Sequence, residues 1–498
     1  MRKKEVSLIS LPKVLLIFPP KGFSSKEPLP ALGLIYLAAM LERDGIPVEI
    51  LDAAVEHLSW RKLKKRIKEI SPDIVGITSL TEFRYEAFQT ARIAREVLGK
   101  EVPITMGGPH VSLTADDTMR FQPEIDVVVR GEAEYTFLEL CYALWEGKDL
   151  SGIRGISYRK NGEIIHNLPA ELPADLDALP FPARHLMDMD RYDFRLDVPG
   201  KGSLPAAHII TSRGCPFHCS FCATSKLSGR RWRHRSPENV LAELEDILQK
   251  QPKVKAVWFY DDTFTMNKRR VEAICDGIME RKLDIAFTCS IRVDTVNYDL
   301  LKKMRDAGCF KVFFGVESGS PRILDEVCQK QITLEQVENV SKWLDDLGIE
   351  KNPGYIISFP DETREDAEET LNFMKKVGGI ASMSLLRIYP GTRIEEVARE
   401  RGILPEDFSW SRDDQPVPNQ FSAAHGESPI FIDRLSWDEL SDLTLQWAQY
   451  QGISPWKKLP EVLRNVRSWE DFKHVWMLGW RYVRKKVIGS RGKARGKR

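Results

Sequence analysis

The sequence predicts an α/β protein with two parallel sheets, in which a doubly wound, Rossmann-like sheet precedes a partial (β/α)6 barrel. Three observations support this fold class. Short apolar runs alternate with helical stretches, helix start and stop signals separate them, and polar or glycine residues follow the strands. The chain has 498 residues, enough for two or three domains. We expect an α/β domain over 1–150, a linker over 151–205, the barrel over 206–395, and a helical C-terminal region with a basic tail over 396–498.

The composition excludes several classes of protein. Hydrophobic residues make up 42% and charged residues 29% of the chain, which is ordinary for a globular protein. The net charge of +1 creates no overall field that would favour a nucleic-acid partner. Few cysteines, no secretory signal and no apolar run of roughly 20 residues together predict a cytoplasmic protein. Five cysteines stand alone and are expected to be buried apolar residues: Cys141, Cys275, Cys289, Cys309 and Cys328.

In the N-terminal domain, strand and helix alternate about five times. The expected strands are 13–20, 48–52, 73–79, 102–106 and 126–129, and the expected helices are 32–44, 60–70 and 85–98. Ligands of doubly wound sheets bind at the carboxyl ends of the strands. The polar and glycine residues found at those ends are Thr78, Ser79, Gly107, Gly108, His110, Gly131 and Glu132. They predict a ligand site, with strand termination as the alternative explanation of the glycines. There is no G-x-G-x-x-G or Walker A motif to support a dinucleotide or nucleoside triphosphate site.

The linker contains a hairpin signal at Asn161-Gly162, followed by a proline-rich stretch over 168–182. Six further strands are expected over 207–212, 256–260, 285–289, 311–316, 354–359 and 383–389. Helix signals lie between them, such as Ser236-Pro237 at a start and Thr333-x-x-Gln336 as a capping box. Six βα units predict a partial parallel barrel, in which ligands gather at the C-terminal ends of the strands.

Three cysteines, Cys215, Cys219 and Cys222, form a C-x3-C-x2-C triplet directly after the first barrel strand. They cannot pair as disulfides without leaving one thiol over. An iron–sulfur cluster normally takes four thiolates, so three predict a [4Fe–4S] cluster with one iron left open for a substrate or cofactor. A zinc site with His218 as fourth ligand is the alternative, although structural zinc sites usually pair two separated knuckles.

Polar residues also follow the other barrel strands. They are Asp261 and Asp262, Arg292 and Asp294, Glu317 and Ser318, the segment 360–363, and the segment 389–392. Each could be a turn or a cap when taken singly. Together with the cysteine loop they occupy one rim of the expected barrel, which predicts a binding site there.

The triplet, with Phe221 before its last cysteine, resembles the signature of the radical S-adenosylmethionine (SAM) superfamily, and the rim matches the pattern of its barrels. Segments 30–34, 107–110 and 130–134 resemble the cobalamin-binding domain that precedes many radical SAM domains. The Asp-x-His-x-x-Gly motif, whose histidine ligates cobalt in many cobalamin domains, does not occur. Cobalamin would therefore lack that lower ligand, and His110 is expected to be a loop residue or polar contact.

The resemblance implies three cofactors: a [4Fe–4S] cluster, SAM and cobalamin. The cluster would be held by Cys215, Cys219 and Cys222, which would make them the metal-binding and catalytic residues. Glu317 and Ser318 would contact the methionine or ribose of SAM, Arg292 its carboxylate, and Phe221 its adenine. Cobalamin would be contacted by Thr78, Ser79, Gly107, Gly108, His110, Gly131 and Glu132.

Three functions follow. The first is a cobalamin-dependent radical SAM enzyme that makes a 5′-deoxyadenosyl radical, a methyltransferase acting on an unactivated carbon of a small molecule. The second is a radical oxidative cyclase or ring-forming enzyme acting on a tetrapyrrole or lipid. The third, of another class, is a non-catalytic iron–sulfur electron-transfer protein, against which the full rim argues. Either enzyme would take electrons from a reductant protein such as flavodoxin or ferredoxin.

The C-terminal region is expected to be helical over 437–451 and 469–487. Residues 484–498 carry eight Lys and Arg and no acidic residue. The alternatives are a solvated tail and a helix that rests on a membrane surface, which would give peripheral membrane contact.

Overall fold

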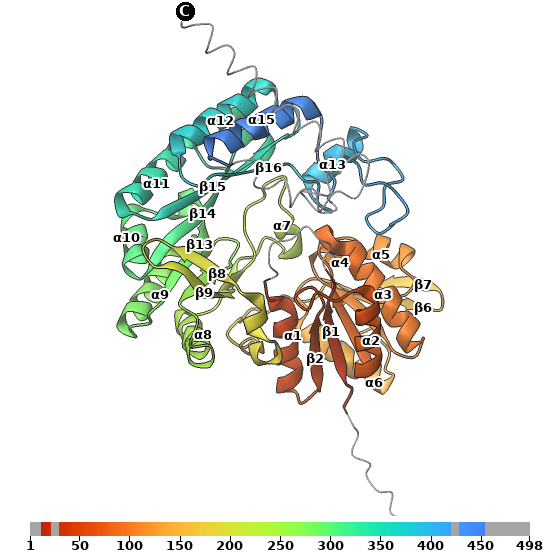
Figure 1. Cartoon of the computed structure of the whole chain (residues 1–498). Helices are drawn as coiled ribbons and strands as arrows, with labels where there is room; N and C mark the ends of the chain where they lie inside the picture. The colour runs from red at the N-terminus through yellow and green to blue at the C-terminus, as the bar shows by residue number, and fades with distance from the viewer. Residues whose placement is uncertain (1–10, 21–28, 420–427, 454–498) are drawn as a thin grey trace, which may run out of the picture. The chain divides into compact units, whose positions relative to one another are not determined.

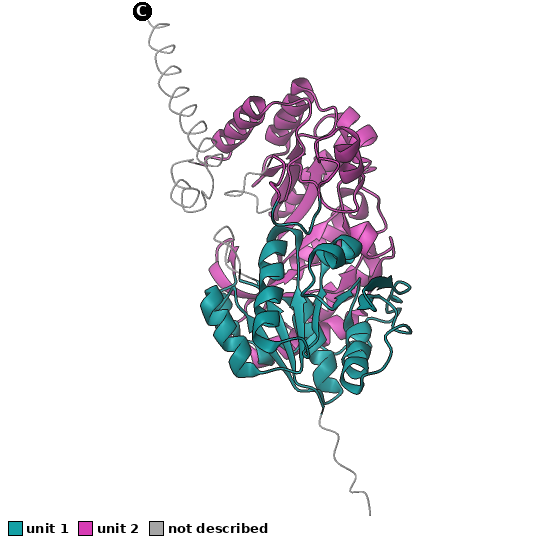
Figure 2. Ribbon diagram, turned by 90° about the vertical axis from the view of Figure 1, so that its right-hand side faces the viewer, with its two compact units in different colours: residues 1–194, 409–414 teal, residues 195–408, 415–498 magenta. Residues whose placement is uncertain are grey.

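The computed structural model describes residues 11–20, 29–419 and 428–453. The chain divides into two compact units, shown in separate colours in Figure 2. The first comprises residues 1–194 with 409–414, and the second comprises residues 195–408 with 415–498. The boundaries at 150, 205 and 395 remain predictions.

A seven-stranded sheet forms the centre of the first unit, in the order β2-β1-β3-β4-β5-β6-β7 (Figure 1). Its strands are β1 (Val14–Phe18), β2 (Val48–Asp52), β3 (Ile74–Thr78), β4 (Ile104–Gly107), β5 (Val127–Val129), β6 (Ile156–Lys160) and β7 (Glu163–His166). The pairs among β1 to β5 are parallel, and β6 and β7 add an antiparallel hairpin. This order is that of a doubly wound sheet, which confirms the predicted fold class.

Helices pack on both sides of this sheet. They are α1 (Leu32–Arg43), α2 (Trp60–Ile70), α3 (Arg84–Leu98), α4 (Pro109–Leu113), α5 (Ala115–Phe121) and α6 (Glu134–Glu146). Helix α2 illustrates the local rules: the Ser59 hydroxyl accepts a hydrogen bond from the Lys62 amide, and Leu63, Ile67 and Ile70 form its buried face. The hairpin turn is also as predicted, because Asn161 and Gly162 both take positive φ angles.

The sheet of the second unit has the order β16-β15-β14-β13-β12-β9-β8. Its strands are β8 (Arg195–Val198), β9 (Gly202–Ile209), β12 (Ala256–Phe259), β13 (Ala286–Ile291), β14 (Cys309–Glu317), β15 (Glu350–Ile357) and β16 (Ser382–Leu385). Six strands run parallel, and β8 pairs antiparallel with β9 at the edge. Since β16 and β8 are the two ends of the sheet, it is the predicted partial barrel rather than a closed one.

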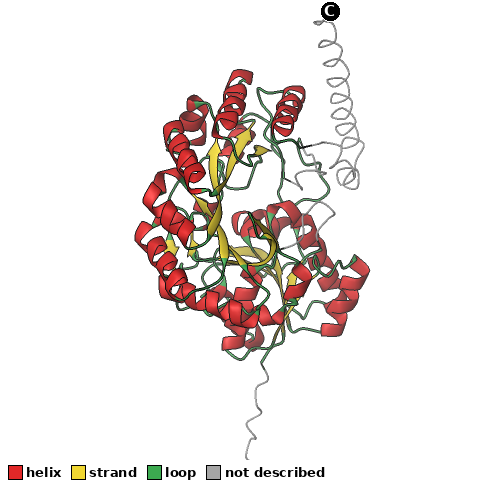
Figure 3. Ribbon diagram, turned by 60° about the vertical axis from the view of Figure 1, so that its left-hand side comes forward, coloured by secondary structure: helices red, strands yellow, loops and turns green. Residues whose placement is uncertain are grey.

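A row of helices lines one face of this second sheet (Figures 1 and 3). They are α8 (Pro237–Lys250), α9 (Lys268–Glu280), α10 (Tyr298–Asp306), α11 (Leu334–Leu347) and α12 (Arg364–Val377). The predicted caps are present: Ser236 accepts from the Asn239 amide, and Thr333 forms a capping box with Gln336. The helices α13 (Arg393–Glu400) and α15 (Trp437–Tyr450) follow, and α15 confirms the helix expected over 437–451.

The first barrel strand differs from the prediction, which placed it over 207–212. Strand β9 starts at Gly202 and ends at Ile209, and Ser212–Arg213 instead forms β10, a short antiparallel pair with β11 (Arg233–His234). The prediction that the strand reaches Ser212 is wrong because this segment pairs with β11.

The predicted helix over 469–487 and the basic tail lie outside the described residues. Within the described residues, no helix has the length and apolar character needed to cross a membrane.

Candidate functional site

The cysteine loop connects β10 to the short helix α7 (Thr224–Leu227). Cys215, Cys219 and Cys222 are free thiols and are half-buried. Burial raises the pKa of Cys215 and Cys219, because it disfavours the thiolate in a protein without bound metal. The loop therefore presents three thiols from one short segment at the start of the barrel.

Asp261 holds the base of this loop. It follows β12 and is buried. Its carboxylate accepts hydrogen bonds of 2.6 Å each from the Thr211 amide, the Thr211 hydroxyl and the Ser212 hydroxyl. Arg270 donates to the Thr211 carbonyl from the other side, at 2.8 Å. The sequence placed Asp261 on the rim without a role, and the structure shows that it fixes the chain just before the cysteines.

Gly214 allows the loop to pass close to its own return segment. Its φ of 85° is in the left-handed region. A Cβ atom built on it would clash with the Arg231 carbonyl oxygen and lie 2.9 Å from the Ser228 side chain. Only glycine fits here, since both the space and the backbone angle exclude a side chain.

The other side of the loop is fastened to the segment that follows β14. The Ser220 amide donates to the Cys328 carbonyl at 3.0 Å. Cys328 ends a π-helical turn, η6 (Ile323–Cys328). This contact ties the chain between Cys219 and Cys222 to a segment that no sequence motif had marked.

Phe221, expected to lie against adenine, contacts Phe359 edge-on, with ring centroids 6.0 Å apart. Phe359 follows β15 and is buried. The neighbouring aromatic ring fixes the position of Phe221 beside the cysteines.

Arg292, expected to bind the SAM carboxylate, is 7% exposed. Its guanidinium forms two hydrogen bonds of 3.0 Å to the Asp294 carboxylate and lies 3.5 Å from the ring centroid of Phe217 in the cysteine loop. It also donates to the Lys330 carbonyl at 2.8 Å. In this structure the Arg292 guanidinium is therefore already hydrogen-bonded to Asp294. The pairing of Arg292 with the carboxylate of SAM remains a prediction.

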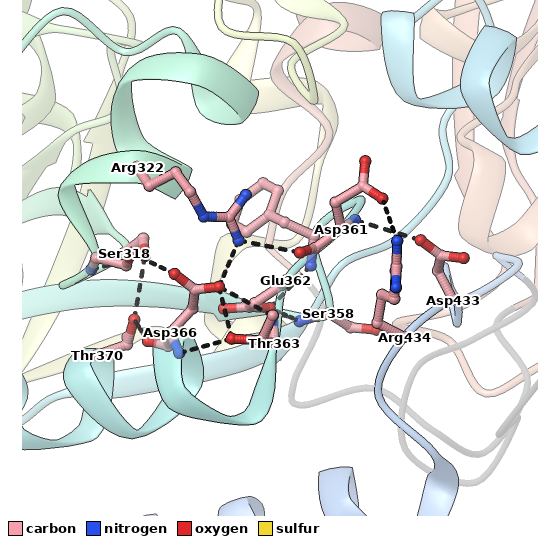
Figure 4. A network of polar contacts seen from close by, with 12 residues as sticks. Ser318, Arg322, Ser358, Asp361, Glu362, Thr363, Asp366, Thr370, Asp433 and Arg434 are labelled. Carbon is pink, nitrogen blue, oxygen red and sulfur yellow. Dashed lines mark hydrogen bonds and ion pairs between the residues drawn. The ribbon is translucent and has the colours of Figure 1, made fainter.

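Glu317 ends β14 and Ser318 follows it; both are buried, but they have different partners. The Glu317 carboxylate accepts from the Lys330 ammonium at 2.5 Å. The Ser318 hydroxyl lies 3.1 Å from the Thr370 hydroxyl of α12, within the network drawn in Figure 4. Sequence reasoning missed Lys330, which stands in no recognisable motif. The contact of Glu317 and Ser318 with SAM remains a prediction.

In the first unit, Gly108 brings the loop after β4 against the loop after β3. Its φ is 101°, and a Cβ atom there would lie 2.6 Å from the Ser79 carbonyl oxygen and 3.0 Å from the Thr78 hydroxyl. Gly107 lies at the end of β4, beside Val129. The structure thus brings four of the predicted cobalamin contacts together: Thr78, Ser79, Gly107 and Gly108.

His110 is fully buried beneath these loops. Its Nδ1 atom lies 3.1 Å from the Thr81 hydroxyl, and its ring packs near Phe88 and Trp410, with centroids 6.1 and 6.3 Å away. Burial, and then the nearby Arg84, hold the pKa of His110 well below its usual value, so the ring is neutral.

The last two predicted contacts lie after β5. Gly131 has a φ of 79° and open space around its Cα. Its amide donates to the Ser112 hydroxyl at 2.9 Å, which ties this loop to α4. Glu132 follows it and is half-buried.

The residues present fit both prosthetic groups. Among the described residues, no three His, Cys, Asp or Glu side chains converge on a single-ion site. A [4Fe–4S] cluster is larger than a single ion and takes its thiolates further apart, because each thiolate binds a different iron. In the first unit, the Ser79 hydroxyl and the His110 Nε2 atom are buried with no hydrogen-bond partner among the described residues. Such buried polar atoms beside glycine backbone suit a large polar ligand.

Comparisons with known proteins match both the barrel and the N-terminal domain. Residues 209–374 match the model of the radical SAM superfamily, and residues 22–141 match that of the B12 binding domain. An uncharacterized methyltransferase of Pyrococcus horikoshii is 42% identical over 397 residues, covering 79% of this chain and 84% of the relative. The anaerobic magnesium-protoporphyrin IX monomethyl ester cyclase of Rubrivivax gelatinosus is 32% identical over 390 residues, covering 77% and 68%.

Solved structures show the same fold. The radical SAM methyltransferase TsrM of Kitasatospora setae, with cobalamin and a [4Fe–4S] cluster bound, superposes with a TM-score of 0.69 at 20% identity and covers 88% of this chain and 91% of its own. The cobalamin-dependent radical SAM enzyme OxsB, with aqua-cobalamin and SAM bound, gives 0.72 at 20% identity, covering 96% and 72%. From its two domain matches and its close relatives, the chain belongs to the cobalamin-dependent radical SAM enzymes, whose cofactors are a [4Fe–4S] cluster, S-adenosylmethionine and cobalamin.

Proposed function

We propose that this enzyme transfers a methyl group to an unactivated carbon of a small molecule. The observation that carries the proposal is the Pyrococcus relative named as a methyltransferase, which is 42% identical over most of both chains. Relatives named as methyltransferases of a cytidylyl phosphonate and of a bacteriochlorophyllide, 26% identical, point the same way. Together, the bound cofactors supply a carbon-centred radical and a methyl donor.

The site residues are part of this proposal. Cys215, Cys219 and Cys222 would hold the cluster. Glu317, Ser318, Arg292 and Phe221 would contact SAM. The cobalamin contacts would be Thr78, Ser79, Gly107, Gly108, His110, Gly131 and Glu132. The task of these side chains is to fix the reacting groups and exclude water, for which rigid supports such as Asp261 and Phe359 are suited.

The test uses full-length protein whose cluster is reconstituted under anaerobic conditions. The protein is then supplied with SAM that carries a label in its methyl group. Under reduction we expect 5′-deoxyadenosine to form, and label to be recovered in the protein-bound corrinoid even before the substrate is known. A Cys219→Ala variant should retain the corrinoid but form no 5′-deoxyadenosine. Label that never leaves SAM would contradict methyl transfer.

The second candidate is a radical oxidative cyclase, favoured by the Rubrivivax cyclase at 32% identity. It predicts 5′-deoxyadenosine without any transfer of label, so the same experiment separates the two functions. The third expectation, a non-catalytic electron-transfer protein, is set aside because the chain belongs to a family of enzymes.

Either enzyme needs an external electron, and we propose a small reductant protein of the flavodoxin or ferredoxin kind as its source. We also propose a cytoplasmic location. Peripheral membrane contact through 469–487 remains a prediction on a segment outside the described residues.

A further inference from the structure

Arg292 joins the cysteine loop to the short loop that follows η6. Its guanidinium carbon lies 3.5 Å from the ring centroid of Phe217, which stands between Cys215 and Cys219. Its Nη2 atom donates to the Lys330 carbonyl at 2.8 Å. A cation this close to a ring face is attracted to it, and solvent screens the attraction little because Arg292 is buried. Arg292 is therefore in contact with two loops that are far apart in the sequence.

Arg292 is itself fixed in one orientation. Two hydrogen bonds of 3.0 Å join its guanidinium to the Asp294 carboxylate in a bidentate arrangement. The backbone is held as well, because Thr295 donates to the Arg292 carbonyl from its amide at 3.0 Å and from its hydroxyl at 2.8 Å. The hydrogen bonds of the guanidinium use its Nε and Nη2 atoms. Within the described residues, the Nη1 atom is thus left for the expected contact with SAM.

The loop after η6 is also fixed, and it meets the cysteine loop at a second point. The Cys328 carbonyl accepts from the Ser220 amide at 3.0 Å. Gln329 and Gln331 have left-handed backbone angles, with φ of 54° and 59°. Such angles are unfavourable for residues other than glycine, so they persist only where surrounding contacts fix the chain. The cysteine loop is therefore supported by this segment on both sides of Cys219, through the arginine before it and directly after it.

We propose that Arg292 is a positioning residue that holds Phe217, and with it the cysteine loop, in the path that takes up the cluster. Three thiolates of one loop can bind three irons of a cluster only if the loop keeps their spacing. Contacts that fix the loop before the cluster binds reduce the conformational entropy that binding has to remove. The cluster then binds more tightly and is lost more slowly. This inference goes beyond the proposed function, since it is separate from SAM binding and applies equally to a methyltransferase and a cyclase.

The test measures how fast iron is released to a chelator from full-length protein with a reconstituted cluster, without SAM and in the absence of oxygen. Phe217→Leu removes the ring but leaves the hydrogen bonds of Arg292, and we expect iron to be released about 2- to 30-fold faster. Arg292→Met removes the cation and its hydrogen bonds and should release iron at least as fast. Because the two side chains act on each other, the double variant should release iron no faster than Arg292→Met. Phe217→Tyr keeps the ring face and should restore the parent rate.

Amide hydrogen exchange of the same variants before reconstitution reports on the loop alone. Residues 215–222 should exchange faster in Phe217→Leu than in the parent, whereas β13 and β14 should stay protected. The matched control is Arg281→Met, which removes an arginine at the end of α9 that pairs with Glu238 and Glu245 of α8. It should leave both the release of iron and the exchange of the loop unchanged.

Parent rates of iron release and of exchange in Phe217→Leu would overturn the inference, even where Arg292→Met binds SAM more weakly, because Arg292 would then act on SAM alone. A double variant whose rate is the product of the two single effects would overturn it as well, because the two side chains would then act independently. If Arg292→Met does not fold, Phe217→Leu and Phe217→Tyr decide. A fall in melting temperature without faster release of iron assigns the contact of Arg292 with Phe217 a purely structural role.

Discussion

Glu362 is a buried carboxyl group that shapes the end of β15, close to the proposed adenine contact. Its Oε2 atom accepts from the amides of Ser358 and Phe359, the second at 2.9 Å, while Oε1 is buried with no partner among the described residues (Figure 4). Ser358 has a φ of 77°, which the two hydrogen bonds help to hold. Burial is the main cause that raises the pKa of Glu362 to about 8. The group is therefore largely protonated at neutral pH, and it fixes the turn that positions Phe359 against Phe221.

Stability should depend on pH through Glu362. Its folded-state pKa of about 8 exceeds the ordinary value of 4.5, so the folded protein binds the extra proton between these limits. The stabilising contribution is full below the lower value and is lost as the pH rises through the upper one, at up to about 1.4 kcal/mol per pH unit. Glu362→Gln keeps an acceptor but cannot ionise. Melting temperatures measured from about pH 5 to 9 should therefore fall less steeply for this variant than for the parent.

The control is Glu362→Ala, which removes the acceptor and should lower the melting temperature at every pH, because it leaves two amides without a partner. Parallel pH curves for the parent and Glu362→Gln would show that the carboxyl group does not titrate in this range.

The residues of the site could be predicted from the sequence better than their partners could. Arg292 and Asp294 are two positions apart and were found together on the expected rim. The Lys330 partner of Glu317 is 13 positions further along, and Asp261 accepts from Thr211, 50 positions before it. The spacing of apolar and turn residues in the sequence predicts where strands end. It does not predict which polar groups form hydrogen bonds, because a buried donor or acceptor pairs with a group that the fold brings near.

Among the elements, strands were predicted well wherever buried apolar runs ended at a turn signal, as for β2 (Val48–Asp52), which matches the expected range. The predicted end of the first barrel strand, Ser212, lies beyond the observed end of β9 at Ile209. The sequence predicts one strand over 207–212 because no turn residue interrupts the run of Ile, Thr and Ser. Asp261 holds Thr211 and Ser212 by three hydrogen bonds, and Ser212 pairs with His234 in the short ribbon. A tertiary contact therefore overrode local propensity at the entrance to the cysteine loop.

Gly214 directly follows β10, and we expect it to be required for the cysteine loop to keep its path. In Gly214→Ala, the new methyl group would meet the Arg231 carbonyl, so the loop must move and we expect a large loss of bound iron and sulfide after reconstitution. Gly229→Ala is the matched control: its φ is 62°, but nothing lies within 4 Å of the added atom. Both changes carry the left-handed backbone cost of about 1–2 kcal/mol. Equal iron contents in the two variants would show that the close approach at Gly214 is dispensable.

At the scale of the whole molecule, the chain enters the first unit twice. Residues 409–414 belong to that unit although residues of the second unit flank them in sequence (Figure 2). The Trp410 carbonyl accepts from the buried Arg84 guanidinium at 2.9 Å, and the Ser411 carbonyl accepts from Gln122 at 2.6 Å. The sequence could not reveal this, because a short run of serine, tryptophan and charged residues has no periodicity to assign it to a sheet or helix.

Because residues 409–414 belong to the first unit, we expect a substitution of Trp410 to destabilise that unit. Trp410 is 3% exposed, so Trp410→Ala should cost about 3–5 kcal/mol of local stability. The control is Trp60→Ala on α2, where the side chain is 39% exposed and the loss should be small. In hydrogen exchange by mass spectrometry on the full-length protein, Trp410→Ala should deprotect α3 and α5, which contact the 409–414 segment through Arg84 and Gln122, the residue that follows α5. It should leave β13 to β15 protected. Deprotection of α13 and the barrel strands, with α3 and α5 unchanged, would place the segment energetically in the second unit instead.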